Sequence, residues 1–228
     1  MPGRVYAITG AFGVLGSAVA QAAAARGGRL ALIDTHPQPR SPPPADALIL
    51  GGVDLTDADA ATRAMDAVAE RFGGLDALLN IAGGFAWETH ADGSADTWRQ
   101  LFKLNVETAA NVSRAAIPHL KRSGAGRSVS VGANAALKAG LGMAPYAASK
   151  AGVHALTQSL AEELKGDGVT VNAVLPSIID TPTNRADMPK ADFSAWVAPD
   201  DLAAVMLFLA SEEARAVTGA LIPVTGRV

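Results

Sequence analysis

Residues 5–16 read VYAITGAFGVLG, and the alanine-rich run AVAQAAAA follows at 18–25. Apolar and β-branched residues, a glycine-rich turn and then small helix formers predict a strand, a tight turn and a helix. Glycines let the backbone approach a pyrophosphate closely, and the N-terminus of the following helix offers unpaired N–H groups. The stretch therefore predicts a dinucleotide-binding unit. The turn residues expected to contact the dinucleotide are Gly10, Phe12, Gly13, Val14, Leu15 and Gly16.

Further apolar runs follow at spacings that leave room for helices. Their near-continuous apolarity predicts a parallel sheet covered on both faces. We expect an α/β fold, a single Rossmann-type doubly wound domain over residues 1–228, with about seven parallel strands flanked by helices on both faces. The expected strands are 5–9, 30–33, 47–53, 75–81, 128–131, 169–175 and 221–224, and the expected helices are 15–26, 57–72, 97–121, 145–165 and 200–210. Prolines in THPQPRSPPPA, at 35–45, predict an extended loop in place of the second crossover helix.

The composition excludes several classes of protein. The absence of cysteine excludes disulfides, thiolate zinc sites, iron–sulfur clusters and a cysteine nucleophile. The 19 basic and 22 acidic residues are interspersed without a basic stripe, so nucleic acid is not an expected partner. The histidines lack the paired spacing of a metal site, and we expect no metal.

One uncharged run has the length of a signal peptide or a membrane span. It lies between Arg4 and Arg26, but glycines and polar residues interrupt it, and the strand–turn–helix interpretation explains it better. We therefore expect a cytoplasmic protein that does not contact a membrane.

Asp34 ends the second expected strand, where a carboxylate can hold two ribose hydroxyls of the dinucleotide. Its charge repels the additional phosphate of NADP, and Ala11 and Phe12 supply no nearby cation. NAD(H) is therefore the preferred cofactor. Arg40 on the proline-rich loop keeps NADP(H) open as an alternative.

Tyr146 and Lys150 lie four residues apart in PYAASKAG, on one face of an expected helix. A tyrosine titrates near a pKa of about 10, and lowering that pKa to about 7 requires roughly 4 kcal/mol of preferential stabilisation of the phenolate. The Lys150 cation beside a cationic nicotinamide can supply part of it. Tyr146 is therefore a candidate general acid or base.

These motifs together resemble the short-chain dehydrogenase/reductase family over essentially the whole chain. TGAFGVLG is similar to the cofactor loop of that family, VDLTD at 53–57 to its adenine-contacting segment, and NIAGG at 80–84 to its NNAG element. The resemblance implies that Tyr146 and Lys150 are catalytic, that Lys150 also binds ribose, and that Asn105 holds a proton-relay water. The other implied cofactor contacts are Asp54, Leu55, Asn80, Ala82, Gly83, Pro176, Ile179 and Thr181, the last as an anchor of the nicotinamide carboxamide.

The chain departs from the family pattern in two places. Val14 stands where most members carry the middle glycine of the turn, and Ala133 stands thirteen residues before Tyr146, where the family has its catalytic serine. That serine donates a hydrogen bond to the reacting carbonyl oxygen, and losing such a donor costs about 10² to 10³ in rate. Asn134 and Ser130 are the nearest replacements. A quinonoid substrate needs the donor less, because its conjugated ring spreads the incoming charge.

The departures resemble those of the dihydropteridine reductases, which share GxxGxLG, the short second crossover, an aromatic residue after AGG, and Ala at the serine position. The similarity is closest at 135–161 and 175–196, which includes an expected substrate lid at about 177–198. The resemblance implies NADH reduction of a quinonoid dihydropteridine, with a proton from Tyr146. Asn105 is more similar to the general family than to this subgroup.

Aromatic side chains near the expected site can stack on a planar heterocycle. Packing beneath loops is the alternative for each of them, and solvent exposure on the lid is the alternative for Arg185. The substrate candidates are Phe85, Trp87, Ala133, Asn134, Arg185 and Trp196.

Three functions remain open. The first is an NADH-dependent oxidoreductase acting on a small, dihydropteridine-like molecule. The second is a general alcohol or ketone dehydrogenase with a replacement for the missing serine. The third is a nicotinamide-binding regulatory protein without turnover, against which Tyr146, Lys150 and Asn105 argue. Family members pair through helices near 97–121 and 145–165, which implies a homodimer or homotetramer.

Overall fold

The carboxyl ends of parallel strands meet along one edge of a single sheet in the computed structural model of the protein, which describes residues 3–228. The strand order is β3-β2-β1-β4-β5-β6-β7. The order reverses between β1 and β4, and ligands of such sheets bind beyond the carboxyl ends at that point. The strands are β1 (Val5–Thr9), β2 (Arg29–Asp34), β3 (Leu48–Gly51), β4 (Ala77–Asn80), β5 (Arg127–Val131), β6 (Thr170–Pro176) and β7 (Leu221–Val224). The predicted fold class is confirmed.

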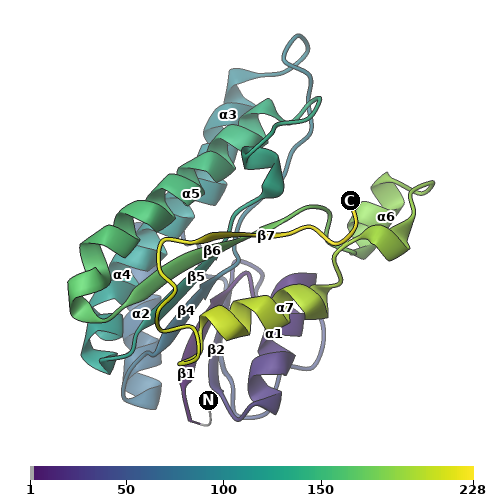
Figure 1. Ribbon diagram of the computed structural model, residues 1–228. Helices are drawn as coiled ribbons and strands as arrows, with labels where there is room; N and C mark the ends of the chain where they lie inside the picture. Colours follow the sequence, from purple (N-terminus) through teal and green to yellow (C-terminus); the bar gives the residue numbers. More distant parts are fainter. Residues whose placement is uncertain (1–2) are drawn as a thin grey trace.

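Helices cover both faces of the sheet (Figure 1). Tyr6 and Ile8 of β1 point to one face and pack beneath α1 (Val14–Ala25) and α7 (Pro199–Leu209). Val5 and Ala7 point to the opposite face, where the core includes α2 (Ala58–Phe72), α4 (Thr108–Ser123) and α5 (Ala144–Leu164). Because every β1 residue is buried, the uninterrupted apolar sequence of this strand follows from its central position.

The long helix predicted at 97–121 is not regular. It consists of α3 (Ala95–Phe102), a π-helical turn (Lys103–Glu107) and α4, which follow one another without a break. The π-helical turn contains the buried Asn105. Such turns are frequent at functional sites because they redirect one residue of a helix.

The predicted strands 47–53 and 75–81 are shorter in the structure. Gly52 has a φ of +75°, which ends β3 after Gly51. The Ile81 N–H donates to the Thr9 side chain at 3.0 Å, and β4 ends at Asn80. Both strands therefore stop where the chain turns into the ligand-binding edge.

The second crossover is an extended loop, as its prolines predict. This loop is fastened to α1, since Gln21 Nε2 donates to the Pro42 carbonyl oxygen at 3.3 Å. The segment expected to form a lid contains α6 (Pro182–Asp187), which projects beside the C-terminus in Figure 1. Its two ends are joined by backbone hydrogen bonds from Asp180 N to Val197 O and from Val197 N to Ile178 O, at 2.8 and 2.9 Å.

Candidate active site

A groove of about 460 Å³ runs along the carboxyl edge of the sheet, where β1, β2 and β4 end. Most of the predicted cofactor contacts line it together. They are Gly10, Phe12, Gly13, Val14, Leu15, Gly16, Asp34, Asp54, Leu55, Ala82, Gly83 and Thr181. Further lining residues, which the predicted set omits, are Thr35, His36, Arg40, Val53, Thr56, Ile81, Leu104, Thr108 and Thr183.

The glycine-rich turn can form only without side chains at two positions. Gly10 has a φ of +62°, and a Cβ there would lie 3.0 Å from the Ala82 Cα. A Cβ at Gly16 would overlap the Gly10 carbonyl oxygen. Gly13 is the N-cap of α1, so Val14 becomes the first helical residue and its side chain, 45% exposed, lies at the wall of the groove. The valine at the middle-glycine position is therefore accommodated.

Asp34 lines the groove at the end of β2. Its carboxylate accepts hydrogen bonds from the backbone N–H groups of Phe12 and His36, both at 2.9 Å. Asp54 lies further along the groove, where hydrogen bonds from the Thr56 hydroxyl and backbone lower the pKa of its carboxyl. Both carboxylates therefore occupy fixed positions at the cofactor edge.

Thr9 organises the opposite wall, although its sequence position at the end of an apolar strand was the only signal for it. Its hydroxyl donates to Asn80 Oδ1 at 2.9 Å and accepts from the N–H groups of Ile81 and Ala82 at 3.0 and 3.1 Å. Asn80 is buried and does not line the groove. Asn80 instead holds the Thr9 side chain, and Thr9 in turn holds the Ile81–Ala82 backbone, which packs against Gly10.

Tyr146 and Lys150 lie in the first turns of α5, and Lys150 is only 5% exposed. Burial lowers the pKa of Lys150 to about 8 and raises that of Tyr146 to about 12. Lys150 Nζ donates to the Val131 carbonyl oxygen at 2.8 Å. In the protein alone, burial is the cause that raises the pKa of Tyr146, and stabilisation of its phenolate by Lys150 together with a cationic nicotinamide stays a prediction.

Asn105 connects α5 to the segment that follows β4. Its side-chain amide donates to the Gly84 carbonyl oxygen at 3.0 Å and to Ser149 Oγ at 2.9 Å, while its Oδ1 accepts from Gly84 N at 2.9 Å. Ser149 in turn donates to the Tyr146 carbonyl oxygen at 2.8 Å. The Asn105 side chain thus bonds to protein groups, and Ser149, three residues after Tyr146, belongs to the same network.

Two loops meet above Tyr146. The Phe85 ring lies edge-on to the Tyr146 ring, with centroids 4.9 Å apart. Trp87 Nε1 donates to the Leu141 carbonyl oxygen at 2.9 Å, so the loop after β4 is fastened to the loop before α5. Phe85 and Trp87 are both 55% exposed. Of the predicted aromatic candidates, Phe85 is the one whose ring packs against Tyr146.

The remaining candidates lie in or beside the lid segment. Arg185 pairs with Asp180 through two hydrogen bonds and lies 4.9 Å from the Phe193 ring centre. Trp196 is 7% exposed and packs against Phe193. Both side chains therefore hold the segment together. Pro176 is paired with Val224 in the sheet, Ile179 bridges Val197, and neither lines the groove.

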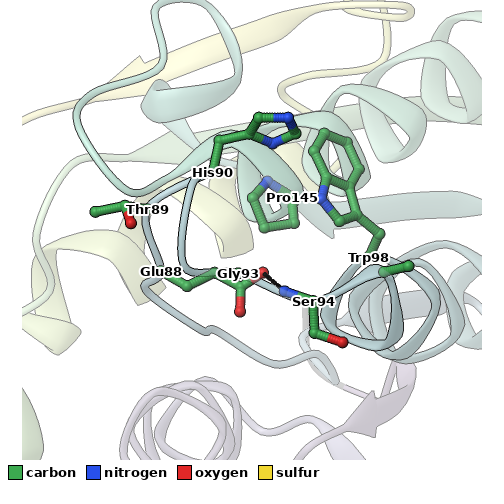
Figure 2. Close-up of a pocket in the computed structure, with 8 residues that line it drawn as sticks. Glu88, Thr89, His90, Gly93, Ser94, Trp98 and Pro145 are labelled. Atoms are coloured by element: carbon green, nitrogen blue, oxygen red, sulfur yellow. Dashed lines mark hydrogen bonds between the residues drawn. The ribbon is translucent and has the colours of Figure 1, made fainter.

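A second cavity, of about 220 Å³, lies outside the cofactor groove (Figure 2). Its lining side chains include His90 and Trp98, which stand around Pro145. Glu88 accepts hydrogen bonds from Ser94 N and Thr97 Oγ1 at 3.3 and 2.8 Å. The carboxylate therefore orders the loop that precedes α3.

Within residues 3–228, no group of three or more histidine, aspartate or glutamate side chains is placed to hold a metal ion. In the same range no helix combines the length and the apolarity needed to cross a membrane.

The profile of the short chain dehydrogenase family matches residues 4–192. The chain belongs to this family. It is 34% identical to the meso-2,3-butanediol dehydrogenase of Serratia marcescens, over 98% of this chain and 93% of that protein. The structure of levodione reductase matches with a TM-score of 0.91 and 25% identity, and covers 99% of this chain and 97% of its own. Carveol dehydrogenase from Mycobacterium avium, in complex with NAD, matches with a TM-score of 0.87 and 27% identity, over 99% and 97%.

The protein is therefore an NAD(P)-dependent oxidoreductase of the short-chain dehydrogenase family. The groove fits a nicotinamide dinucleotide. The glycine turn is close-packed, since a Cβ on Gly16 would overlap the Gly10 carbonyl oxygen, and the groove that this turn lines has a volume of about 460 Å³. Asp34 can hold ribose hydroxyls, and Thr181 also lines the groove. Tyr146 and Lys150 are not among its lining residues, but Lys150 Nζ lies close to Gly83, which is, since a Cβ added to Gly83 would be 3.3 Å from it.

The departure from the short-chain dehydrogenase pattern at Ala133 is visible in the structure. Ala133 lies two residues after the end of β5, is 2% exposed, and precedes a short 3₁₀ turn that begins at Asn134 and packs against α5. Ser130 lies within β5 and is buried in the sheet, where it pairs with Asn80. The position of the family's serine thus carries a methyl group.

Proposed function

We propose that this short-chain dehydrogenase uses NADH to reduce a conjugated substrate, for which quinonoid dihydropteridine is the reference compound. The observation that carries the proposal is the alanine at position 133, at the end of β5 and beside the catalytic helix. A methyl group donates no hydrogen bond to a carbonyl oxygen, so a simple ketone loses a stabilisation of about 10² to 10³ in rate. A conjugated ring that delocalises the incoming electron pair depends less on that donor.

The proton chemistry of the site suits reduction. When bound, the nicotinamide supplies the hydride. Tyr146 holds its phenolic proton well above neutral pH, because burial raises its pKa to about 12. Lys150, whose pKa burial lowers to about 8, releases a proton more readily than an exposed lysine. One hydride and one proton from Tyr146 convert the quinonoid ring to its tetrahydro form, and a proton passing toward Tyr146 by way of Lys150 restores the phenol.

Asp34 supports the preference for NADH. Its carboxylate accepts two backbone hydrogen bonds, so it is held in place at the ribose end of the groove. The additional phosphate of NADPH would meet this negative charge. Arg40, on the loop after β2, is the one arginine or lysine among the described residues that line the groove, and it keeps NADPH open as an alternative.

Phe85 supports a planar substrate. Its ring contacts Tyr146 edge-on and remains 55% exposed, so one ring surface is free for contact. Offset stacking on such a ring contributes about 0.5 to 1.5 kcal/mol beyond the area that it buries.

A general alcohol or ketone dehydrogenase is the second candidate. The name of the Serratia marcescens relative favours it, because that protein is called a butanediol dehydrogenase. This function requires a replacement for the missing serine donor, and Asn134, the next residue, is the side chain best placed along the chain to provide one.

The test is NADH consumption by the purified protein with quinonoid dihydropteridine, compared with NADPH and with a panel of small ketones and vicinal diketones. Tyr146→Phe is the control for turnover at this site. Tyr146-dependent reduction of the pteridine with NADH supports the proposal. Turnover of ketones alone establishes the second candidate. Cofactor binding without turnover of any substrate in the panel contradicts both candidates and leaves either a substrate outside the panel or a nicotinamide-binding regulatory protein.

We also propose that the enzyme is a cytoplasmic homodimer or homotetramer. Trp98 and Phe102 support this assembly, because they are 39% and 50% exposed on α3, beside the helices expected to pair. Light scattering on the purified protein gives the mass of the assembly.

A further inference from the structure

His154 is a buried residue that the catalytic mechanism described so far does not use. It lies four residues after Lys150 and eight after Tyr146 on α5, so the three side chains share one face of the helix. Its side chain is directed to the end of β5, where its Nε2 accepts a hydrogen bond from the Ala133 backbone N–H at 3.3 Å.

The packing around the ring shows that this contact is built into the fold. A Cβ on Gly132 would overlap His154 Nε2 and would lie 2.7 Å from its Cδ2. Only glycine therefore fits between the ring and the strand end. The Gly132 N–H donates to the Val174 carbonyl oxygen at 2.9 Å, which fixes the glycine from the opposite side.

The same short segment is held at a second point. Lys150 Nζ donates to the Val131 carbonyl oxygen, two residues before Ala133. Two side chains of α5 thus bind residues 131–133: Lys150 donates a hydrogen bond to this segment, and His154 accepts one from it. His154 can accept this hydrogen bond only while its Nε2 carries no proton. Burial, together with the nearby Lys150 cation, lowers the pKa of the His154 ring and so favours its neutral form.

We propose that His154 is a positioning residue for hydride and proton transfer, which fixes Ala133 and the following 3₁₀ turn against the catalytic helix through the Ala133 N–H···Nε2 hydrogen bond. The inference rests on the proposed function, because it assigns a role within the same site. Because Ala133 has only a methyl group, the substrate is positioned by the shape of the surface that Ala133 and the 3₁₀ turn form. Displacement of this surface moves the substrate away from Tyr146. A misplacement of about 1 Å can lower a rate by about 10²-fold.

Two substitutions separate the hydrogen bond from the volume of the side chain. His154→Gln keeps an acceptor at a similar distance from the backbone, whereas His154→Leu keeps an apolar side chain without an acceptor. His119→Leu is the matched control, because His119 is also buried and hydrogen-bonded, but its partners are Asp66 and Arg122 between α2 and α4. Each variant is assayed for kcat and KM on the best substrate of the panel above, for NADH affinity by fluorescence, and for thermal stability.

We expect His154→Leu to lower kcat by about ten- to a hundredfold with less than about a threefold change in NADH affinity. His154→Gln should restore most of kcat, and His119→Leu should leave kcat unchanged even where it lowers stability. Unchanged kcat in His154→Leu, or an equal loss in His154→Gln, overturns the proposal.

Hydrogen exchange at residues 131–135 tests the contact without turnover. Protection of the Ala133 amide should be lost in His154→Leu and retained in His154→Gln. If the wild-type protein reduces no substrate, the proposed function fails, but this measurement still decides whether His154 holds the segment. Equal protection in all variants overturns the inference on its own.

Discussion

Lys150 Nζ donates a hydrogen bond to the carbonyl oxygen of Val131 at 2.8 Å, and so ties α5 to the last residue of β5. This carbonyl oxygen accepts from the buried ammonium group without any ligand present. Lys150 is therefore already in place before a dinucleotide binds. Burial removes water from the Lys150 ammonium group, and this loss of solvation lowers the pKa of Lys150 to about 8.

Stability should depend on pH through this lysine. Between pH 8 and about 10.5 the unfolded chain keeps a proton on Lys150 that the folded protein has released, so stability rises with pH across this window. Between about pH 10 and 12 the folded protein keeps the Tyr146 proton that the unfolded chain has lost, so stability falls. Urea unfolding of the wild type and of Lys150→Met from pH 7.5 to 10 measures the first effect, and equal pH profiles would contradict it.

Substitution of Ala133 by serine should restore the missing donor. Because Ala133 is buried and serine is only slightly larger, the fold should accept the hydroxyl group. We expect ketone turnover to rise by up to about 10²-fold, while pteridine reduction changes little. Steady-state kinetics on both substrates decide the matter. An unchanged ketone rate would mean that position 133 does not face the reacting oxygen.

Asp34 should set the choice between NADH and NADPH. Asp34→Asn removes the charge but keeps one acceptor for the Phe12 or His36 N–H. Loss of a charged hydrogen-bonding group costs roughly 1.5 to 3 kcal/mol, so NADH affinity should fall by about ten- to a hundredfold, and NADPH should bind relatively better. Fluorescence titration with both cofactors measures the ratio. Asp59→Asn, on the exposed start of α2, is the charge-matched control.

Asn105 and Ser149 should be energetically coupled, because they are joined by a hydrogen bond of 2.9 Å. Asn105→Ala leaves the N–H and carbonyl groups of the half-buried Gly84 without their partner and should destabilise the fold by about 1 to 3 kcal/mol. Ser149→Ala alone should cost less. A double-mutant cycle in urea should give a coupling of at least about 0.5 kcal/mol. Strict additivity would show that the network does not act as a unit.

Much of the fold could be predicted from apolar periodicity. The buried strands read as continuous apolar runs because both faces of the sheet are covered, and β1 shows this most clearly. The glycine turn was predictable for a local reason, because its backbone geometry excludes side chains at Gly10 and Gly16. Tyr146 and Lys150 were found by their spacing, which a single helix converts into proximity.

The features that were not predicted depend on contacts between distant segments. The apolar periodicity of the sequence does not reveal the π-helical turn at Lys103–Glu107. This turn places the buried Asn105 side chain against Gly84, a contact between segments distant in the sequence. Burial of Trp196 depends on the folded lid segment around it. Burial raises the pKa of Tyr146, and this shift could not be predicted from the sequence because it depends on which residues cover the ring.

The position of β1 between β2 and β4 has a consequence for synthesis of the chain. Thr9 finds its partner Asn80 only 71 residues later, and Asn105 completes the opposite wall after that. During synthesis the glycine-rich turn at 10–16 therefore leaves the ribosome long before β4, the strand that supports it. Until β4 emerges, one edge of β1 has no strand to pair with. Nascent chains that end before residue 77 should consequently fail to retain NADH, and competence to bind it should arise only after β4 and the π-helical turn have emerged.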